Sequence, residues 1–509
     1  MTVRRVMGIE TEYGIVVPGD PSANPMVASG DVVTAYGASR GIRPARASWD
    51  YADEAPLRDA RGFDMGRGQA HPSQLTDVED PTLANIVLTN GARLYVDHAH
   101  PEYSSPEVTT PRDAVTWDRA GELVMREAVA RLATVPPGVN LYKNNTDGKG
   151  ASYGTHENYL MSRATPFASI VKHLMPFFVV RQVMCGSGRV GIGVDSRTPG
   201  YQIAQRSDFF EVEVGLETTL KRPLVNTRDE PHAVADRYRR LHVILGDANH
   251  ADVANLLKMG TTSLVLAMIE DDAIRDDLSV RRPVATLHEV SHDPTLQQKV
   301  ELTDGRRMTA VELLWEYHDR ASRYVDERSG ADPDPDTAEV LHWWSTVLDR
   351  LGRDPMEARR EVDWVAKLAV LEGYRARDGV GWGDPRLKAV DLQWSDVRAD
   401  RGLAQRLAAS GRLEVLVPES EVQRAVDHPP TDTRAWFRGT CLRRFPDDVV
   451  AASWDSVIFD VAGQRTLQRV PMLEPLRGTE AGVGELVRSA PDAASLLRAL
   501  AASTDDGRA

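Results

Sequence analysis

Hydrophobic and polar residues alternate along the first strand-like segment of the chain, from residue 6 to residue 16. Alternation with a period of two predicts a β-strand with one buried face and one polar face. The same period returns at residues 92–96 and at residues 238–245. Between residues 138 and 228 the pattern favours further strands separated by glycine-rich turns, with one apolar helix near residues 166–175. The first half of the chain is therefore expected to contain a sheet.

Helical spacing of apolar residues appears between and after these strands. Residues 112–134 have the pattern of an amphipathic helix, and residues 251–268 predict another. Helices dominate from about residue 311 to residue 424, with the strongest apolar stripes at residues 311–325, 338–351 and 356–371. The mixture of strands and helices predicts the α/β (α+β) class.

A polar tract from about residue 18 to residue 81 has few aliphatic residues and no sustained period. A tract of this length without structure is usually a lid, a binding loop or a disordered insertion. We interpret residues 41–80 as a flexible loop insertion in a catalytic domain that spans residues 1–424. Residues 425–509 have strand and helix patterns of their own and are expected to form a small C-terminal domain.

Composition limits the classes of function. The chain has 509 residues with 42% hydrophobic residues and a formal net charge of −14, which argues against sequence-independent nucleic-acid binding. Residues 167–180 come closest to a membrane span, but Lys172, His173 and Pro176 interrupt them, so no membrane partner is expected. The first residues lack the apolar core of a secretion signal, and only two cysteines are present. The cytoplasm is therefore the expected compartment.

Glu10 and Glu12 stand two residues apart in the first predicted strand. Side chains at positions i and i+2 of a strand project from the same face, so both carboxylates point together, opposite Ile9 and Thr11. Two carboxylates on one face repel each other unless a cation lies between them, and Mg²⁺ prefers oxygen ligands. Taken alone, the pair predicts either a metal site or a solvated edge strand.

Three further predicted strands carry polar side chains opposite their apolar residues. Their polar faces hold Arg93, Tyr95 and Asp97 on one strand, with Glu102 beyond the following turn; His156 and Asn158 on the second; and Arg240 and His242 on the third. Single histidines in strands are more often structural than ligands. Together with the glutamate pair, however, these faces describe a cup of carboxylates, histidines and arginines. That composition is expected for two Mg²⁺ ions that hold nucleotide phosphates.

Two other metal or nucleotide sites are disfavoured. Zinc fits less well than magnesium because the cup lacks thiolates and its carboxylates outnumber its imidazoles. The glycine motifs at residues 186–188 and 191–193 are too short and badly placed for a dinucleotide-binding loop. Such a loop needs a strand before it and a helix after it. We expect these glycines in hairpin turns.

Four motifs in the right order resemble the Pup ligase and depupylase family. They are Gly8-Ile9-Glu10-Thr11-Glu12-Tyr13-Gly14; Leu94-Tyr95-Val96-Asp97 with His100-Pro101-Glu102-Tyr103; His156-Glu157-Asn158-Tyr159; and Leu241-His242-Val243-Ile244. The resemblance runs from residue 6 to at least residue 250 and resumes at residues 433–439. That family shares the carboxylate-amine ligase fold of glutamine synthetase. The resemblance therefore implies a large antiparallel, glutamine-synthetase-like sheet cradled by helices.

The resemblance also implies roles for individual residues. Two Mg²⁺ ions would be held by Glu10, Tyr95 and Glu102 and by Glu12, His156 and His242. ATP or ADP would be contacted by Arg93, Ser105, Asn158, Arg240 and Trp436. Asp97 would be the catalytic carboxylate, acting either as the nucleophile or as the base that activates one.

The polar tract distinguishes the two reactions of this family. Ligases of the family run almost directly from the first strand to the Tyr-Val-Asp strand, whereas this chain has about forty more residues there. Such an insertion resembles the loop of the depupylase/deamidase branch. The resemblance thus implies hydrolysis of the isopeptide bond between the C-terminal glutamate of Pup and substrate lysines, and deamidation of the C-terminal glutamine of Pup.

Several alternatives stay open at this point. The closest rival is an ATP-dependent Pup–protein ligase, followed by ligation of glutamate to a small amine and by a non-catalytic scaffold that only binds nucleotide or Pup. Pup is acidic and disordered in this family, so a local basic groove would help to capture it despite the negative total charge. A monomer is the expectation, and the sequence leaves the oligomeric state open. We also expect deletion of residues 41–80 to preserve folding but alter turnover.

Overall fold

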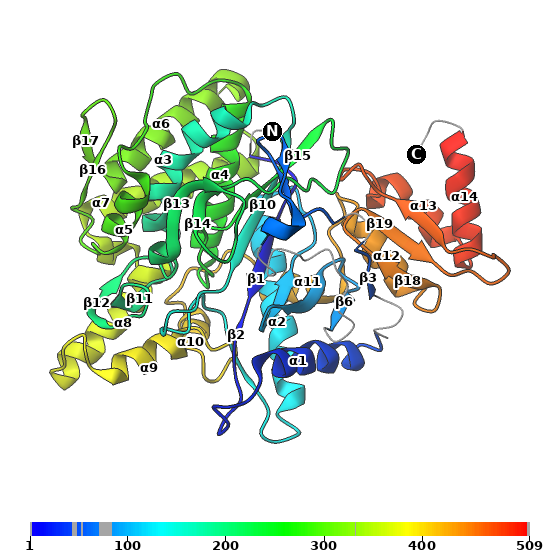
Figure 1. Ribbon diagram of the computed structural model, residues 1–509, viewed down its shortest axis with the longest axis horizontal. Coiled ribbons are helices and arrows are strands. Elements are labelled where there is room, and N and C mark those ends of the chain that lie inside the picture. Colours follow the sequence, from blue (N-terminus) through cyan, green and yellow to red (C-terminus); the bar gives the residue numbers. More distant parts are fainter. Residues whose placement is uncertain (1–2, 43–47, 52–53, 71–83, 331, 506–509) are drawn as a thin grey trace.

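A ten-stranded sheet forms the centre of the molecule. The structure is a computed structural model that describes residues 3–42, 48–51, 54–70, 84–330 and 332–505 (Figure 1). The strand order is β15-β10-β1-β8-β7-β6-β3-β18-β19-β20, and every neighbouring pair is antiparallel except β3 and β18. The strands of this sheet are β1 Met7–Glu12, β3 Ser48–Trp49, β6 Asn85–Val87, β7 Arg93–Asp97, β8 His100–Ser104, β10 Thr155–Ser162, β15 Tyr238–Val243, β18 Val449–Ala452, β19 Ser456–Phe459 and β20 Gln468–Pro471.

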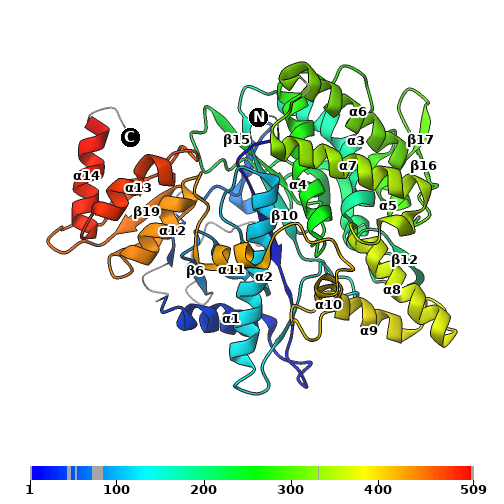
Figure 2. The same ribbon diagram turned by 180° about the vertical axis from the view of Figure 1, so that it is seen from behind.

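Helices cover one face of this sheet. Seen from behind in Figure 2, α1, α2 and α11 lie in front of the strands, and α2 packs on β1 while α1 packs on β7 and β8. A further layer of helices, which includes α3, α6 and α7, packs around α4. The helices are α1 Pro25–Ser39, α2 Pro111–Leu132, α3 Phe167–Cys185, α4 Asp252–Glu270, α5 Pro283–Ser291, α6 Ala310–Ser329, α7 Pro335–Arg353, α8 Asp363–Asp378, α9 Pro385–Trp394, α10 Leu403–Ala409, α11 Glu419–Asp427, α12 Ala435–Arg444, α13 Glu480–Ser489 and α14 Ala493–Asp505.

Short hairpins and pairs complete the architecture. Their strands are β2 Gly14–Val16 with β9 Asn140–Tyr142, β4 Arg58–Asp59 with β5 Phe63–Asp64, β11 Arg189–Ile192 with β12 Thr198–Gln202, β13 Phe210–Gly215 with β14 Arg222–Asn226, and β16 Lys299–Glu301 with β17 Arg307–Thr309. The glycines between residues 186 and 193 lie before and within the β11–β12 hairpin, three of them with positive φ. The prediction of turns for these glycines is therefore confirmed.

Local sequence explains where the main helix begins. Pro111 occupies the first turn of α2, where its missing N–H costs nothing, and the side chain of Thr110 accepts a hydrogen bond from the N–H of Asp113. The apolar stripe of α2 faces the sheet, with Ala120 and Val124 fully buried. The helix predicted at residues 112–134 is thus confirmed to within two residues.

Two helices of the protein, α3 and α4, are long and apolar enough to cross a membrane if length and composition alone are considered. The most apolar window of α4 is 94% buried inside the protein and that of α3 is 67% buried. Both helices are therefore accounted for as core helices that pack against each other.

The expectation of an unstructured tract between residues 18 and 81 is wrong for much of its described part. Residues 25–39 form α1, which is capped by the side chain of Asn24, and Trp49 of β3 is buried. The sequence hid α1 because its apolar residues are small, scattered and interrupted by glycines. Residues 43–47, 52–53 and 71–83 of the predicted loop lie outside the described residues.

β3 has a consequence for the predicted deletion. This strand lies inside the predicted loop, yet it joins the sheet between β6 and β18. Removal of residues 41–80 would take this strand out of the sheet, so the structure argues against the expectation that folding survives the deletion unchanged. One other prediction is also wrong: the single helix expected at residues 356–371 is interrupted, because a short 3-10 turn at Pro355–Ala358 precedes α8.

The C-terminal part has a hydrophobic core of its own. This core gathers residues between 436 and 496, together with Trp49 and Val87 from the first hundred residues. Its strands β18, β19 and β20 continue the central sheet, and the boundary predicted after residue 424 falls inside α11. The division into two domains therefore stays a prediction.

Ion pairs of Glu107 with Arg434 and Arg438 connect this C-terminal part to the segment that follows β8. Glu107 accepts hydrogen bonds from Arg434 at 2.8 Å and from Arg438 at 2.5 Å, and both arginines are buried. Burial alone would raise the pKa of Glu107, but Arg438 and Arg434 lower it to about 2. Because the pKa is lower in the folded state than its usual 4.5, the stabilisation is complete above about pH 4.5 and is lost as the pH falls towards 2.

We expect the substitution Glu107→Gln to lower the stability at neutral pH by about 3 kcal/mol, because it leaves two buried guanidinium groups without their carboxylate. Thermal unfolding at pH 7 and at pH 4 measures the effect, and the difference from the wild type should shrink at the lower pH. Glu301→Gln is the matched control, since Glu301 and its partner Arg281 are exposed. Equal stability of Glu107→Gln and the wild type at pH 7 would contradict the proposed anchor.

Candidate functional site

Strand pairing brings the predicted site residues onto neighbouring positions of the sheet. β1 lies between β10 and β8, so that Glu10 is opposite His156 and Glu12 is opposite Glu102. β10 pairs in turn with β15, which carries His242. The polar faces of these strands meet on the side of the sheet opposite α2. Together they form the cup that the sequence predicts.

Glu10, His156 and His242 form the first cluster of the cup, with one ligand atom of each within 4.8 Å of the others. His156 Nδ1 is 3.3 Å from Glu10 Oε2, and Asn158 donates a hydrogen bond to Glu10 Oε1 at 2.9 Å. Burial alone would raise the pKa of Glu10, but His156, His242 and Arg240 lower it below its usual range. Burial and Arg240 hold the pKa of His242 well below 6.5. An ionised carboxylate and a neutral imidazole are the forms that bind metals.

Glu12, Asp97 and Glu102 form the second cluster, again with ligand atoms within 4.8 Å of one another. Glu102 is 1% exposed, and its Oε2 has no hydrogen-bond partner among the described residues. Burial and the charges of Asp97, Glu12 and Glu10 raise the pKa of Glu102 well above its usual value. Three neighbouring carboxylates, one of which has an oxygen without a hydrogen-bond partner, fit a divalent cation. Such a cation would relieve the repulsion between their negative charges.

The two clusters divide the ligands differently from the family resemblance. The resemblance implies Glu10 with Tyr95 and Glu102, and Glu12 with the two histidines. In the structure, Glu10 lies with the two histidines and Glu12 lies with Glu102. Tyr95 is opposite Glu102 across the β7–β8 pair, with its hydroxyl 3.5 Å from Ser104 Oγ. The structure therefore brings all six predicted ligands to one cup, while their division between two ions stays a prediction.

Asp97 is the most accessible carboxylate of the second cluster, with 27% of its side chain exposed. Burial of its neighbourhood would raise its pKa, but the hydrogen bond from His98, at 2.8 Å, and the nearby His156 and Arg93 lower it. Asp97 is therefore ionised at neutral pH and open to a substrate. These are the properties that a nucleophile or a general base requires.

A pocket that is lined in part by β1, including Glu10, borders the first cluster. Its walls include three of the residues predicted to contact nucleotide, namely Ser105, Asn158 and Arg240. Arg240 donates hydrogen bonds to Asn158 Oδ1 at 2.7 Å and to Glu230 O at 2.7 Å, which fixes its guanidinium at the pocket. Gly8 and Trp454 also line the pocket, which gives it an apolar wall beside these polar groups.

Trp436, which the resemblance assigns to ATP, is not among the residues that line this pocket, and its role stays a prediction. It is buried in the core of the C-terminal part, while Trp454 stands in the pocket wall. The guanidinium of Arg438 lies over the ring of Trp454, 5.0 Å from its centre, in a cation–π contact. Trp454 could not be singled out from the sequence, because nothing in its spacing separates one tryptophan from the other.

Arg93 lies beside the cup and also does not line the pocket. Its guanidinium is sandwiched between the ring of Trp49, at 4.0 Å, and the ring of Tyr95, at 3.9 Å, and its Nε donates to Asn85 Oδ1 at 3.1 Å. Trp49 belongs to the predicted insertion. This part of the insertion therefore helps to fix the orientation of the Arg93 side chain.

Gly154 closes the floor of the cup. Its N–H donates to Glu12 Oε1 at 2.5 Å, just before β10 begins. A Cβ atom at this position would lie 2.3 Å from His156 Nε2 and 2.7 Å from Glu12 Oε1. Only a residue without a side chain leaves both groups in place.

Comparison with known proteins identifies the family. The family model described as Pup-ligase protein matches residues 5–458. The chain belongs to the Pup-ligase family. Within this family it is 61% identical to the depupylase of Acidothermus cellulolyticus, over 98% of this chain and 99% of that protein. It is 56% identical to the Pup deamidase/depupylase of Mycolicibacterium smegmatis, over 98% of this chain and 100% of that protein.

Solved structures of the Pup-ligase family share the fold. The complex between Pup and its ligase PafA matches with a TM-score of 0.77 and 32% identity, over 96% of this chain and 92% of that chain. The Pup ligase PafA in complex with ADP matches with a TM-score of 0.71 and 35% identity, over 79% of this chain and 89% of that chain. The expected α/β fold with a large antiparallel sheet is therefore confirmed, and the second structure shows that a relative with this fold binds ADP. The sequence is much closer to the depupylases than to these ligases.

Proposed function

We propose that this chain hydrolyses the isopeptide bond between the C-terminal glutamate of Pup and a substrate lysine, and deamidates the C-terminal glutamine of Pup. The observation that carries the proposal is the second cluster, in which an accessible, ionised Asp97 adjoins two buried carboxylates. Both reactions are attacks on a side-chain carbonyl, so one site can perform them. The identity to depupylases and the inserted residues before β7 favour hydrolysis over ligation.

The residues of the chain have separate tasks in this proposal. Asp97 attacks the carbonyl or takes the proton from the attacking water, and His98 holds its carboxylate through a hydrogen bond. Arg240 faces the pocket and would neutralise phosphate charge, while Ser105 and Asn158 orient the nucleotide. Trp454 supplies a flat apolar wall of the same pocket.

We propose that the cup holds Mg²⁺ rather than zinc, because its donor set has four carboxylates, two imidazoles and no thiolate. Glu10, His156 and His242 would hold one ion, and Glu12 and Glu102 would hold the other. When bound, Mg²⁺ would neutralise nucleotide phosphates and the oxygen charge that develops during attack. Cys185 and Cys441 are buried and unpaired, which suits the reducing cytoplasm that we propose as the compartment.

Three substrates test the function directly. The purified protein is incubated with a Pup conjugate and with Pup that ends in glutamine, each with ATP or with ADP and with Mg²⁺. We expect release of the free target from the conjugate and of ammonia from the glutamine form. A third reaction, with Pup that ends in glutamate and a free target, should give no conjugate. Conjugate formation that consumes ATP in equal amount would instead establish a ligase and overturn the proposal.

A further inference from the structure

Three consecutive residues lie behind the cup, on the helix-covered side of the sheet. Lys143, Asn144 and Asn145 follow β9, and all three side chains are buried. None of them reaches the cup itself. Asn145 contacts Thr155, which precedes a predicted metal ligand, while Lys143 and Asn144 reach the ligand-bearing strands through intermediate side chains.

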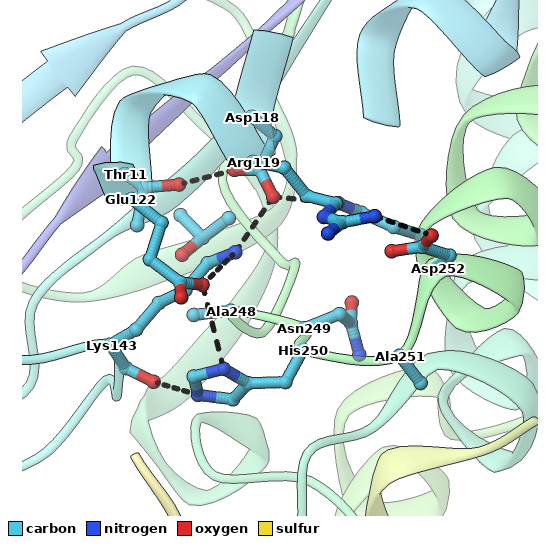
Figure 3. A network of polar contacts seen from close by, with 12 residues as sticks. Thr11, Asp118, Arg119, Glu122, Lys143, Ala248, Asn249, His250, Ala251 and Asp252 are labelled. Carbon is cyan, nitrogen blue, oxygen red and sulfur yellow. Dashed lines mark hydrogen bonds and ion pairs between the residues drawn. The ribbon is translucent and has the colours of Figure 1, made fainter. Parts of the chain in front are cut away.

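Lys143 connects to β1 through Asp118 of α2 (Figure 3). Its Nζ donates to Asp118 Oδ2 at 2.7 Å, and Thr11 Oγ1 donates to Asp118 Oδ1 at 3.4 Å. Thr11 is 1% exposed and stands between Glu10 and Glu12, with its side chain on the opposite face of the strand. The hydroxyl of Thr11 therefore fixes the stretch of β1 that carries both carboxylates.

Asn145 makes the equivalent connection to β10. Its Nδ2 donates to Thr155 Oγ1 at 3.0 Å, and its Oδ1 accepts from the N–H of Ala248 at 2.7 Å. Thr155 immediately precedes the ligand His156 and is paired with Thr11 across the two strands. The two threonines thus form one cross-strand pair. Residues 143–145 bond to Thr155 directly and to Thr11 through Asp118.

Asn144 supports the third side of the cup. Its Oδ1 accepts a hydrogen bond from Tyr153 Oη at 2.6 Å, and the Tyr153 ring is stacked on His100 with ring centres 4.2 Å apart. His100 Nδ1 lies 3.2 Å from Glu12 Oε2. A Cβ atom on Gly14 would come within 2.7 Å of Asn144 Oδ1, so a side chain at residue 14 would displace Asn144.

The rest of the network holds Lys143 in place. Figure 3 shows Lys143 between Asp118 and Glu122, and the Lys143 carbonyl oxygen beside the ring of His250, at 3.2 Å from Nε2. Asn255 of α4 donates to the same Asp118 oxygen at 2.8 Å. A buried charge with several partners has a well-defined position, since any displacement leaves a charge or a polar group without its partner.

We propose that Lys143, Asn144 and Asn145 are positioning residues that hold the ligand-bearing parts of β1, β8 and β10 in the geometry that binds Mg²⁺. This inference rests on the proposed magnesium-dependent function. Residues that hold metal ligands in place affect metal affinity, often by about 10- to 100-fold, without touching the metal.

The substitution Thr11→Val removes the hydroxyl and keeps the shape of the side chain, while Thr11→Ser keeps the hydroxyl. We expect Thr11→Val to raise the Mg²⁺ concentration for half-maximal isopeptide hydrolysis by about 10-fold, with nearly normal turnover at saturating Mg²⁺. Thr11→Ser should restore the wild-type requirement. Thr116→Val is the matched control, since Thr116 is a buried threonine on α2 whose hydroxyl donates only to the helix backbone.

The second variant, Tyr153→Phe, tests the Asn144 connection because it keeps the ring on His100 and removes the hydroxyl. It should also raise the Mg²⁺ requirement, and it keeps the proposal testable if Thr11→Val does not fold. A wild-type Mg²⁺ requirement in both folded variants would overturn the positioning role. A lower melting temperature with an unchanged Mg²⁺ requirement would show that the segment serves stability alone, which also overturns it. Absence of Mg²⁺-dependent hydrolysis in the wild type would refute the proposed function instead.

Discussion

The substitution Asp97→Asn is expected to abolish isopeptide cleavage while nucleotide binding persists. Asp97 is the most accessible carboxylate of the second cluster and is ionised, and an amide at this position can neither attack a carbonyl nor accept a proton from water. Loss of such a group typically lowers a rate by about 100- to 10,000-fold. Cleavage of a Pup conjugate, followed by gel electrophoresis, measures the rate, and titration with a fluorescent ATP analogue measures binding.

A matched variant separates this effect from a general loss of charge. Asp64→Asn changes an exposed carboxylate of β5, with 76% of the side chain accessible, and should cleave at the wild-type rate. His98→Ala removes the hydrogen bond that holds Asp97 and should lower turnover less than Asp97→Asn does. Cleavage by Asp97→Asn at the wild-type rate would show that the catalytic carboxylate has been assigned wrongly.

The substitution Gly154→Ala should nearly abolish activity although it adds only one methyl group. The new Cβ would overlap His156 Nε2 and Glu12 Oε1, one group from each metal cluster, so both must move. A displacement of about 1 Å at an active site can lower the rate about 100-fold. Isopeptide hydrolysis over a range of Mg²⁺ concentrations should show lower turnover and a higher Mg²⁺ requirement.

Gly215→Ala provides the control for Gly154→Ala. Gly215 also lies at a strand, but a Cβ there would have only ordinary contacts, the nearest at 3.6 Å. We expect Gly215→Ala to retain activity. Normal Mg²⁺ dependence in Gly154→Ala would mean that the two clusters do not hold metal in the way proposed.

The alternation of the first strand was enough to predict that Glu10 and Glu12 share a polar face, because the period of a strand is a property of the backbone. It could not predict their partners. Whether Glu10 lies beside His156 or beside Glu102 depends on the register of β1 against β10 and β8, which is set by contacts between distant segments. The cup was therefore predictable as a set of residues, whereas its division into two clusters was not.

Other parts of the fold were hidden for different reasons. α1 escaped prediction because its apolar residues do not gather on one face, so that packing against α2 and the sheet stabilises it more than its own pattern does. Trp454 escaped because a tryptophan ring that lines a pocket and one that fills a core have the same sequence signature. The helices α2 and α4 were visible because both are long, α2 with one clearly apolar face and α4 with apolar residues almost all round.

The place of β3 in the sheet also bears on synthesis of the chain. Ser48 pairs in parallel with Ala451, so about 400 residues separate the two partners. At a translation rate of about 5–20 residues per second, the ribosome needs roughly 20 to 80 s to deliver β18 after β3 has emerged. During this interval the edge of β3 that later binds β18 has no permanent partner and can pair with other exposed strands. The nascent chain would thus be most exposed to aggregation, and most dependent on chaperones, just before its last sixty residues are made.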